Sequence, residues 1–469
     1  MEQIKADICI IGAGSGGLSV AAGAAQMGAS VVLIEGHKMG GDCLNFGCVP
    51  SKALIAAGKV AHGFRGGFGV AAADPVVDYA AAKDHVAGVI AAIEPHDSQE
   101  RFEGLGVRVI RDYGRFISPR EVQAGDHVIR ARRFVIATGS RPFVPPIPGL
   151  DGVPYETNET IFDLRERPGH LLVVGGGPIG LEMAQAHARL GSKVTVIEGM
   201  KALGRDDPEL AAIALDKLRA EGIEIAEDAL AAQISGGPGD ITIQTKDGRS
   251  FHGTHLLMAV GRAANIDKLG LEAAGISHDR AIAVDAGMRT SNRKVYAIGD
   301  VAGGLQFTHV AGYHAGLVIR SALLGMPAKA RTDHLPWATY TDPEIGQVGM
   351  TEEQARARHG DAVEVIRVRF DQIDRALATG KTTGLIKAMV VKGRAVGVSV
   401  VGDGAGELVA FWSLAIAQGL KMSQIASQVA PYPTISEINK RVAGAYFTPR
   451  LFDSKRVKTI VRAVQRWLP

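Results

Sequence analysis

Two of the three cysteines lie five positions apart in a segment that favours redox chemistry. The segment GGDCLNFGCVPSK, residues 40–52, holds Cys43 and Cys48 at a spacing short enough for a disulfide. Pro50 is typical of the first turn of a helix, which predicts that Cys48 lies at a helix N-terminus. There the helix dipole and Lys52 would favour a thiolate, the form that an electron-relaying dithiol requires.

Structural roles for the cysteines fit the sequence less well. Three cysteines are too few for a secreted disulfide scaffold. A zinc site would need further ligands, but His37 and His62 are isolated, so we expect no resident metal. Cys9 falls within a predicted strand, where it acts as a small apolar residue. We therefore predict that Cys43 and Cys48 form a redox-active pair.

A glycine-rich turn between a strand and a helix predicts a nucleotide site near the N-terminus. Residues 7–35 read as strand, turn, small-residue helix and strand. Gly12, Gly14 and Gly17 form a G-x-G-x-x-G pattern, which lets a pyrophosphate approach the backbone at a helix N-terminus. Glu35 ends the second strand, where a carboxylate can accept hydrogen bonds from an adenosine ribose.

The same arrangement recurs in residues 171–198. Gly175, Gly177 and Gly180 repeat the glycine pattern, and Glu198 repeats the terminal acid at the same spacing. Two such units imply two dinucleotide-binding domains.

The acid at the end of the second unit also bears on the choice of nicotinamide nucleotide. Glu198 would repel the 2′-phosphate of NADP(H), so we expect NAD(H). Lys201 and Arg205 follow closely and could contact a phosphate, so NADP(H) stays an alternative.

Other strand ends are assigned to cofactor binding, and two of them support a flavin, FAD. A Thr-Gly pair follows one apolar strand and a Gly-Asp pair ends another, where the aspartate could accept a hydrogen bond from a ribityl hydroxyl. Each pair alone is more typical of an ordinary strand-end turn. The assigned residues are Gly114, Thr138, Gly139, Gly261, Gly299 and Asp300.

Composition limits the classes of partner. A chain of 469 residues predicts two to four domains. A net charge of +3 is too balanced to indicate a nucleic-acid partner. No apolar run reaches the roughly 18 residues that span a bilayer, and the N-terminus shows no signal peptide. We therefore expect a cytoplasmic protein.

Boundaries follow from the two fingerprints and from a proline-rich linker after residue 140. We predict an α/β fold in which residues 1–148 and 265–331 bind FAD and residues 149–264 bind NAD(P). Residues 332–469 mix strands and helices without a nucleotide fingerprint.

Taken together, these motifs resemble the class I pyridine nucleotide–disulfide oxidoreductases, the family of dihydrolipoamide dehydrogenase, glutathione reductase and mercuric reductase. Residues 337–352 are similar to the opening of its dimerisation domain, and residues 432–437, YPTISE, to its final active-site motif. The resemblance covers almost the whole chain. It implies two Rossmann-like domains, an α+β dimerisation domain over 332–469, and a homodimer whose final motif enters the partner's active site.

The resemblance also implies a reaction. In the family, NADH passes a hydride to one face of FAD, and the reduced flavin reduces the disulfide on the other face. Cys48 would be the thiolate nearer the flavin and Cys43 the thiol that exchanges with substrate. Lys52 and Glu182 match an ion pair beside the flavin and the nicotinamide. We expect a small-molecule or protein disulfide as substrate, as for dihydrolipoamide dehydrogenase.

One departure from the family pattern changes the question of substrate. Most members carry a histidine base before the Pro-Thr of the final motif, where this chain has Tyr432. Tyrosine titrates near 10, so it is a poor base, although Glu437 is retained. Mercuric reductases also carry tyrosine here, which suggests metal-ion reduction as the alternative. They use a C-terminal cysteine pair, which this chain lacks.

Two further possibilities stay open. His309 and His314, near Asp300, could supply a base by another route. A non-catalytic redox sensor would need only FAD and the cysteine pair.

The C-terminal segment, residues 450–469, predicts a basic amphipathic helix. Its apolar residues fall on one helical face with lysines and arginines around it. The face could pack on the chain's own dimer or make peripheral contact with a membrane.

Overall fold

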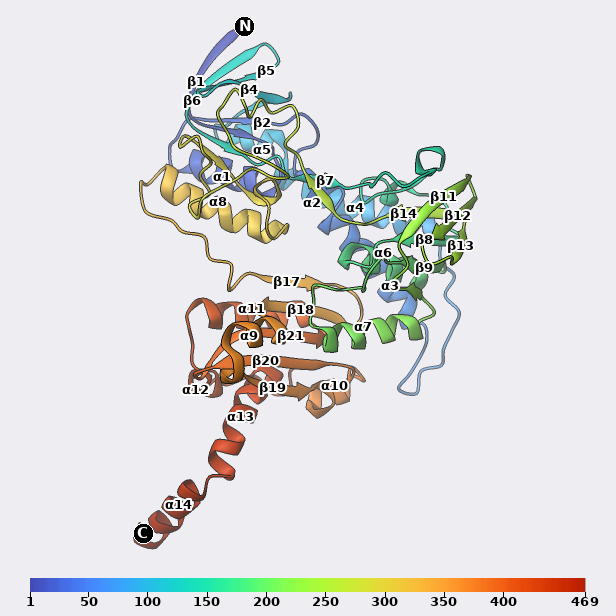
Figure 1. The fold of residues 1–469 in the computed structure, drawn as a ribbon, viewed down its shortest axis with the longest axis vertical. Helices are drawn as coiled ribbons and strands as arrows, with labels where there is room; N and C mark the ends of the chain where they lie inside the picture. Colours follow the sequence, from blue (N-terminus) through green and yellow to red (C-terminus); the bar gives the residue numbers. More distant parts are fainter. Residues whose placement is uncertain (469) are drawn as a thin grey trace. The chain divides into compact units, whose positions relative to one another are not determined.

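The computed structural model describes residues 1–468, and the chain forms two compact units (Figure 1). The first unit contains residues 1–199 and 226–331, and the second contains residues 200–225 and those from 332 onward. Within the described residues, no helix combines the length and the apolar character that crossing a membrane requires.

The first strand–turn–helix–strand unit is built as predicted. It consists of β1 (Glu2–Ile11), α1 (Ser15–Gln26) and β2 (Val31–Ile34), and the two strands pair in parallel. Cys9 is fully buried within β1, as expected. The sheet has seven strands in the order β3-β2-β1-β6-β5-β4, with β16 paired to β6. The other strands are β3 (Arg108–Ile110), β4 (Gly114–Ser118), β5 (Glu121–Ala124), β6 (His127–Ile136) and β16 (Val295–Ala297).

The second strand–turn–helix–strand motif, which lies in the same compact unit, repeats the first. It consists of β8 (His170–Val174), α6 (Pro178–Arg189) and β9 (Lys193–Ile197), again with parallel strands. The sheet order is β10-β9-β8-β14. Its edge strands are β10 (Glu224–Ala226) and β14 (His255–Met258); a separate three-stranded sheet holds β11 (Ala231–Gly237), β12 (Asp240–Thr245) and β13 (Ser250–Gly253).

A short antiparallel ladder lies where the chain passes from one nucleotide unit to the other and returns. It pairs β7 (Ser140–Pro142) with β15 (Arg262–Ala264). The remaining elements of the first unit are helical. They are α2 (Gly41–Asn45), α3 (Cys48–Gly63), α4 (Tyr79–Asp97), α5 (Gln99–Gly104), α8 (Thr308–Ala322), η1 (Leu150–Gly152), η2 (Ile161–Asp163) and η3 (Gly299–Ala302).

The second unit is built on a five-stranded antiparallel sheet in the order β17-β18-β21-β20-β19. Its core includes the fully buried Trp412, whose Nε1 donates a hydrogen bond of 2.8 Å to Asn439 Oδ1. The strands are β17 (Pro336–Thr339), β18 (Glu344–Gly349), β19 (Glu364–Arg369), β20 (Leu385–Val391) and β21 (Arg394–Gly402). The helices are α7 (Pro208–Ala220), α9 (Glu352–His359), α10 (Asp374–Ala378), α11 (Ala405–Ala417), α12 (Met422–Ala426), α13 (Glu437–Phe452) and α14 (Lys455–Trp467), with η4 (Gly360–Ala362) and η5 (Phe370–Gln372).

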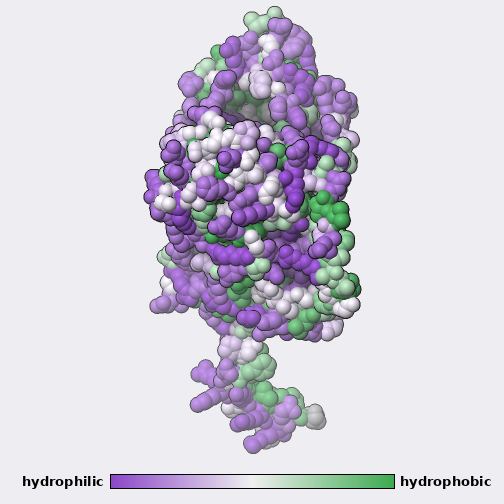
Figure 2. Space-filling model, turned by 90° about the vertical axis from the view of Figure 1, so that its right-hand side faces the viewer, coloured by the Kyte–Doolittle hydropathy of each residue, from purple (hydrophilic) through white to green (hydrophobic). Residues whose placement is uncertain are grey.

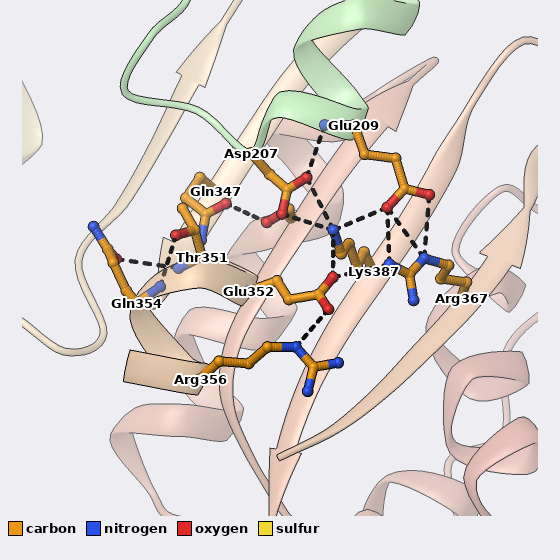
Figure 3. A network of polar contacts seen from close by, with 10 residues as sticks. Asp207, Glu209, Gln347, Thr351, Glu352, Gln354, Arg356, Arg367 and Lys387 are labelled. Atoms are coloured by element: carbon orange, nitrogen blue, oxygen red, sulfur yellow. Dashed lines mark hydrogen bonds and ion pairs between the residues drawn. The ribbon is translucent and has the colours of Figure 1, made fainter. Parts of the chain in front are cut away.

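A buried lysine holds α7 on this sheet (Figure 3). Lys387 of β20 is 3% exposed, and its Nζ lies 2.9 Å from Asp207 Oδ2, 2.9 Å from Glu209 Oε2 and 2.7 Å from Glu352 Oε2. Burial alone would lower the pKa of Lys387, but hydrogen bonds to the three carboxylates raise it above its ordinary value. The sequence assigns the segment after β9 to the NAD(P)-binding domain. In the structure, the ion pairs of Lys387 anchor this segment in the second compact unit.

We expect Lys387→Met to destabilise the protein, because it leaves three carboxylates facing one another without their shared cation. Breaking a buried ion pair from one side costs about 3–5 kcal/mol. Urea unfolding at neutral pH would measure the loss, and Lys440→Met, at an exposed site on α13, is the control. Equal stability of the two variants would contradict the anchoring role.

The same cluster predicts a pH dependence. Burial would raise the pKa of Glu352, but hydrogen bonds from Lys387 and Arg356 hold it at about 2, below its ordinary value of 4.5. Because the folded pKa is depressed, this stabilisation is present above pH 4.5 and is lost as the pH falls toward 2. The stability difference between wild type and Lys387→Met should therefore shrink across that window.

Candidate functional site

The two cysteines lie at the junction of two short helical segments. Cys43 belongs to α2, and Cys48 is the first residue of α3, so its predicted position at a helix N-terminus is confirmed. The N-cap residue Gly47 supplies no side-chain hydrogen bond, so it does not cap the first N–H groups of α3. Both cysteines are free thiols.

The two thiols are electrostatically unequal. A hydrogen bond from Cys43 lowers the pKa of Cys48 to about 6 against the effect of burial, and Thr308 and Lys52 lower it further. The same hydrogen bond, together with burial, raises the pKa of Cys43. Cys48 is therefore the thiolate at neutral pH and Cys43 the protonated partner, which is the polarity that the resemblance implied.

Two hydroxyl groups that sequence reasoning missed contact this pair. Thr308 Oγ1, at the start of α8, lies 3.3 Å from Cys48 Sγ. The hydroxyls of Thr308 and Ser15 both lower the pKa of Cys43, against the larger effects of Cys48 and burial. Thr308 is 260 positions from Cys48 and belongs to no motif, so no local signal marked it.

The cysteine segment packs directly on the first glycine-rich turn. Gly40 and Gly41 have φ of +81° and +60°, and Gly14 forms a parallel bridge with Gly40. A Cβ on Gly41 would lie 2.7 Å from the Cα of Gly14, so no side chain fits between the two backbones. The dithiol is therefore fixed beside the predicted phosphate-binding turn.

The first glycine-rich turn fits a dinucleotide. Gly12 has φ +106°, and a Cβ there would lie 2.4 Å from the carbonyl oxygen of Ala137. A Cβ on Gly17 would lie 1.8 Å from the carbonyl oxygen of Gly12. Gly14 is the N-cap of α1 and has no side chain to cap the helix. The N–H groups of the first helical turn are therefore not occupied by an N-cap side chain. This is the geometry that the pyrophosphate of FAD requires.

The acid after β2 closes the same turn. Glu35 Oε2 accepts a 2.7 Å hydrogen bond from the N–H of Ala13, and Oε1 accepts one of 2.7 Å from the N–H of His37. Each carboxylate oxygen keeps a second lone pair that can accept a ribose hydroxyl. The side chain is thus oriented by backbone groups in advance of any ligand.

The other residues assigned to cofactor binding lie at or near strand ends of the same compact unit. Thr138 and Gly139 follow β6, and Thr138 Oγ1 donates to the carbonyl oxygen of Asn265 at 2.8 Å. Gly299 and Asp300 begin η3, and one residue separates η3 from the end of β16. Gly114 begins β4, where a Cβ would lie 3.3 Å from the side chains of Ile11 and Ile34; Gly261 lies between β14 and β15.

The second glycine-rich turn has the same construction. Gly175 has φ +114°, and a Cβ on Gly180 would lie 2.0 Å from the carbonyl oxygen of Gly175. Gly177 is the N-cap of α6 and supplies no side-chain hydrogen bond. Glu198 Oε2 accepts a 2.7 Å hydrogen bond from the N–H of Gly176, as Glu35 does from Ala13. The turn therefore fits a second dinucleotide.

An ion pair joins the helix that carries Cys48 to the helix of the second turn. Lys52 Nζ of α3 lies 2.7 Å from Glu182 Oε2 of α6, and the Glu182 side chain is 5% exposed. The structure thus brings together the two residues that the resemblance paired across 130 positions.

A network around Arg262 connects the cysteine segment to Asp300. Arg262 Nη2 lies 3.0 Å from Asp42 Oδ1, and Nε donates at 2.7 Å to Ser140 Oγ, which in turn donates at 2.5 Å to Asp300 Oδ2. The Arg262 side chain is 11% exposed. Burial raises the pKa of Asp300, and Ser140 and Arg262 oppose that shift. Sequence reasoning missed Arg262, although it follows the assigned Gly261 directly.

The final motif belongs to the second unit. The exposed Tyr432 donates a 2.8 Å hydrogen bond through its hydroxyl to Asp374 Oδ2, and Asp374 raises the pKa of Tyr432. Glu437 begins α13, and its Oε2 is buried without a hydrogen-bond partner among residues 1–468. A shared site between two copies of the chain stays a prediction.

The two histidines considered as alternative bases, His309 and His314, make different contacts. His314 is buried, its Nδ1 accepts a hydrogen bond of 3.3 Å from the N–H of Gly299, and burial lowers its pKa. The ring of His309 stacks on Phe307 at 5.4 Å. A role for either histidine as a base for the dithiol stays a prediction.

Comparisons with known proteins agree with this arrangement. Residues 6–315 match the model of the pyridine nucleotide-disulphide oxidoreductase family, and residues 335–443 match its dimerisation domain, which indicates a homodimer. A mercuric reductase of Streptomyces lividans is 35% identical over 94% of this chain and 96% of its own length. A dihydrolipoyl dehydrogenase of Bacillus subtilis is 33% identical over 92% and 96%.

Solved structures give the same result. The Cu(II) complex of the HOCl-induced flavoprotein disulfide reductase RclA from Escherichia coli has a TM-score of 0.84 and 29% identity, covering 95% of this chain and 99% of that one. The predicted fold class, with two nucleotide-binding units and a dimerisation domain, is confirmed. The family is FAD-dependent and uses a pyridine nucleotide. The chain belongs to the pyridine nucleotide-disulphide oxidoreductases, as its motifs indicated.

Proposed function

We propose that this protein uses NAD(P)H to reduce a thiophilic metal ion, Hg(II) or Cu(II), through the dithiol of Cys43 and Cys48. The observation that carries the proposal is the hydroxyl of Tyr432, which donates to Asp374 where most of the family places a histidine base. The final motif thus offers the dithiol no imidazole of the kind that thiol–disulfide exchange uses for proton transfer.

The proton balance favours a metal ion over a disulfide. Reducing a disulfide delivers a proton to each leaving sulfur, so an acid–base group beside the dithiol accelerates the reaction. Asp374 raises the pKa of Tyr432, so the phenol remains protonated at neutral pH. One NADH reduces one Hg(II) to Hg(0), or two Cu(II) to two Cu(I), and releases one proton, which bulk water can take up.

The ligands also favour a soft ion. Thiolates select soft metals, and Cys48 is a thiolate near neutral pH because Cys43 donates to it. Among the residues that the structure describes, no group of three or more His, Cys, Asp or Glu side chains could hold a metal ion. Two sulfurs suit the low coordination numbers of Hg(II) and Cu(I), whereas zinc requires four ligands.

The comparisons support the same class of acceptor. Six mercuric reductases are 31–35% identical to this chain, and the RclA structure from Escherichia coli is a Cu(II) complex. These names describe the relatives. They motivate the choice of Hg(II) and Cu(II) as the ions to test here.

The residues of the first unit would hold both cofactors. The first turn, with Glu35 and Asp300, would bind FAD, which supplies two-electron transfer between a nicotinamide and a dithiol. The second turn, with Glu198, would bind NAD(H) in preference to NADP(H), because a carboxylate repels a 2′-phosphate. Lys52 and Glu182 would orient each other between the two sites.

A disulfide substrate is the second candidate function. The polarised pair of Cys43 and Cys48 is suited to exchange, and Glu437 of the family's acid–base motif is retained. The relatives include a dihydrolipoyl dehydrogenase, and RclA is described as a flavoprotein disulfide reductase.

Anaerobic NADH oxidation with different acceptors separates the two candidates. We expect turnover with Hg(II) or Cu(II) and little with oxidised lipoamide or oxidised glutathione. Cys48→Ser should lower metal-dependent turnover at least about a hundredfold, because the thiolate is lost. Full metal-dependent turnover in Cys48→Ser, or disulfide turnover that exceeds metal turnover in the wild type, would contradict the proposal.

Tyr432→His serves as the matched gain-of-function variant in the same assay. Restoring a general base should raise disulfide turnover by about a hundredfold, which is the low end of what such groups contribute. Metal-dependent turnover should change little. If the histidine has no effect on disulfide turnover, the missing base does not explain the choice of acceptor.

The preference for NAD(H) is tested at the second acid. Glu198→Gln removes the charge but keeps the hydrogen-bonding oxygen, so the ratio of kcat/KM for NADH over NADPH should fall about tenfold. Glu166→Gln, at an exposed site of the same unit, is the control for net charge. A wild-type enzyme that prefers NADPH would refute the assignment at once.

The Arg262 network predicts how the reactivity of Cys48 depends on pH. The negative charge of Asp42 raises the pKa of Cys48, and Arg262 lies against that carboxylate. In Arg262→Gln, we expect the midpoint of iodoacetamide alkylation to move up by about one pH unit, since the uncompensated charge disfavours the thiolate. A Cys43→Ser background limits the signal to Cys48.

A second substitution distinguishes charge from packing. Adding Asp42→Asn to Arg262→Gln removes the uncompensated charge and should return the midpoint toward its starting value. If the double variant keeps the shifted midpoint, Arg262 acts through the shape of the segment and charge compensation is refuted.

A further inference from the structure

The C-terminal helix is a well-formed element that the proposed chemistry does not use. Helix α14 (Lys455–Trp467) follows α13, and its N-cap Ser454 accepts a hydrogen bond of 3.3 Å from the N–H of Val457. The structure describes every residue of α14, and none of their side chains is buried. The predicted tail is thus helical over most of its length, and residue 469, its last, lies outside the described residues.

One face of α14 exposes apolar side chains that water solvates poorly. The exposed fractions are 62% for Ile460, 51% for Val461, 85% for Trp467 and 66% for Leu468. At 100° per residue Ile460, Val461, Val464 and Trp467 share one side of the helix, and Leu468 follows as the C-cap. Figure 2 shows hydrophobic and hydrophilic groups on different sides of this C-terminal segment, at the lower end of the view. An exposed apolar stripe of this kind indicates a binding surface.

The charge of α14 has a single sign. Its basic residues are Lys455, Arg456, Lys458, Arg462 and Arg466, and residues 454–468 contain no Asp or Glu. The net charge of the whole chain is only +3, so this helix concentrates positive charge that the rest of the chain offsets. Lys455, Arg462 and Arg466 lie opposite the apolar face, as in helices that rest on a lipid surface.

We propose that α14 docks the protein on an anionic lipid surface, with its apolar face toward the acyl chains and its cations among the headgroups. A second copy of the helix would bring five further positive charges to the same place, whereas anionic lipids neutralise them. The helix has 13 residues, too few to span a bilayer, so it lies in the interface. The proposal is independent of the electron acceptor.

Co-sedimentation of the full-length holoenzyme with vesicles tests the proposal. Binding is expected to vesicles of phosphatidylcholine mixed with phosphatidylglycerol, to weaken with added salt, and to be much lower with phosphatidylcholine alone. Lys458→Glu with Arg462→Glu should lower the bound fraction about tenfold or more, because both headgroup contacts become repulsive. Ile460→Ser with Val464→Ser should weaken binding comparably through the apolar face.

A matched pair of charge reversals provides the control. Lys246→Glu with Arg280→Glu changes the net charge equally at exposed sites of the first unit and should leave vesicle binding unchanged. All variants should keep NADH-dependent flavin reduction, which reports folding. On vesicles, Trp467 emission should shift to shorter wavelength, a change that Trp467→Phe removes.

Three outcomes of the vesicle assay would overturn the proposal. They are no binding to anionic vesicles, equal loss of binding in the control pair, and unchanged binding in both α14 variants. Sedimentation velocity tests whether a second copy of the chain, instead of lipid, covers the apolar face of α14. If Ile460→Ser with Val464→Ser alters the oligomeric state and leaves vesicle binding intact, the apolar face is covered by a second copy of the chain and the lipid proposal is wrong.

Discussion

The structure of the site depends on a contact between two backbones. Gly41 of the cysteine segment lies so close to Gly14 of the first glycine-rich turn that a Cβ would come within 2.7 Å of the Cα of Gly14. This contact leaves no room for a side chain between the two backbones. A turn of this kind presents N–H groups to a pyrophosphate, so the backbone contact would set the position of the dithiol relative to a dinucleotide bound there. Side chains then need only adjust charge.

That adjustment runs through a chain of polar contacts. Cys43 donates to Cys48 and makes it the thiolate, while Asp42, one position before Cys43, disfavours the same charge. Arg262 lies on Asp42 and also reaches Ser140, which bonds to Asp300. A series of ion pairs and hydrogen bonds therefore connects the cysteine segment to Asp300, the residue assigned to the ribityl chain. Such partly buried networks hold their members in one geometry, because a broken contact leaves a charge unpaired.

Local patterns predicted the parts of this site that local physics determines. The two glycine turns, their terminal acids and the helix that begins at Cys48 follow from residue types at fixed spacing. Thr308 and Arg262 could not be found that way, since they reach the cysteine segment only through tertiary packing. The grouping of α7 with the second unit was likewise hidden, because it depends on tertiary contacts with β18 and β21 and on Lys387, a charged residue within a strand that reads as apolar. The three-part division of the chain remains a prediction beside the two compact units.

The duplication of the nucleotide turn shows what distinguishes its two copies. The N–H of Ala13 donates to Glu35 and that of Gly176 donates to Glu198 at the same 2.7 Å, so the turns themselves are equivalent. The difference begins after the second strand of each copy. After β2 the chain forms the cysteine segment and packs it back on its own turn, whereas after β9 it leaves for α7 and the acidic cluster around Lys387. The first turn thus lies against the cysteine segment, whereas the second meets the helix that carries Cys48 through α6, where Glu182 pairs with Lys52. That asymmetry gives the dithiol one nucleotide turn as its direct neighbour, as expected where a single cofactor exchanges electrons with it.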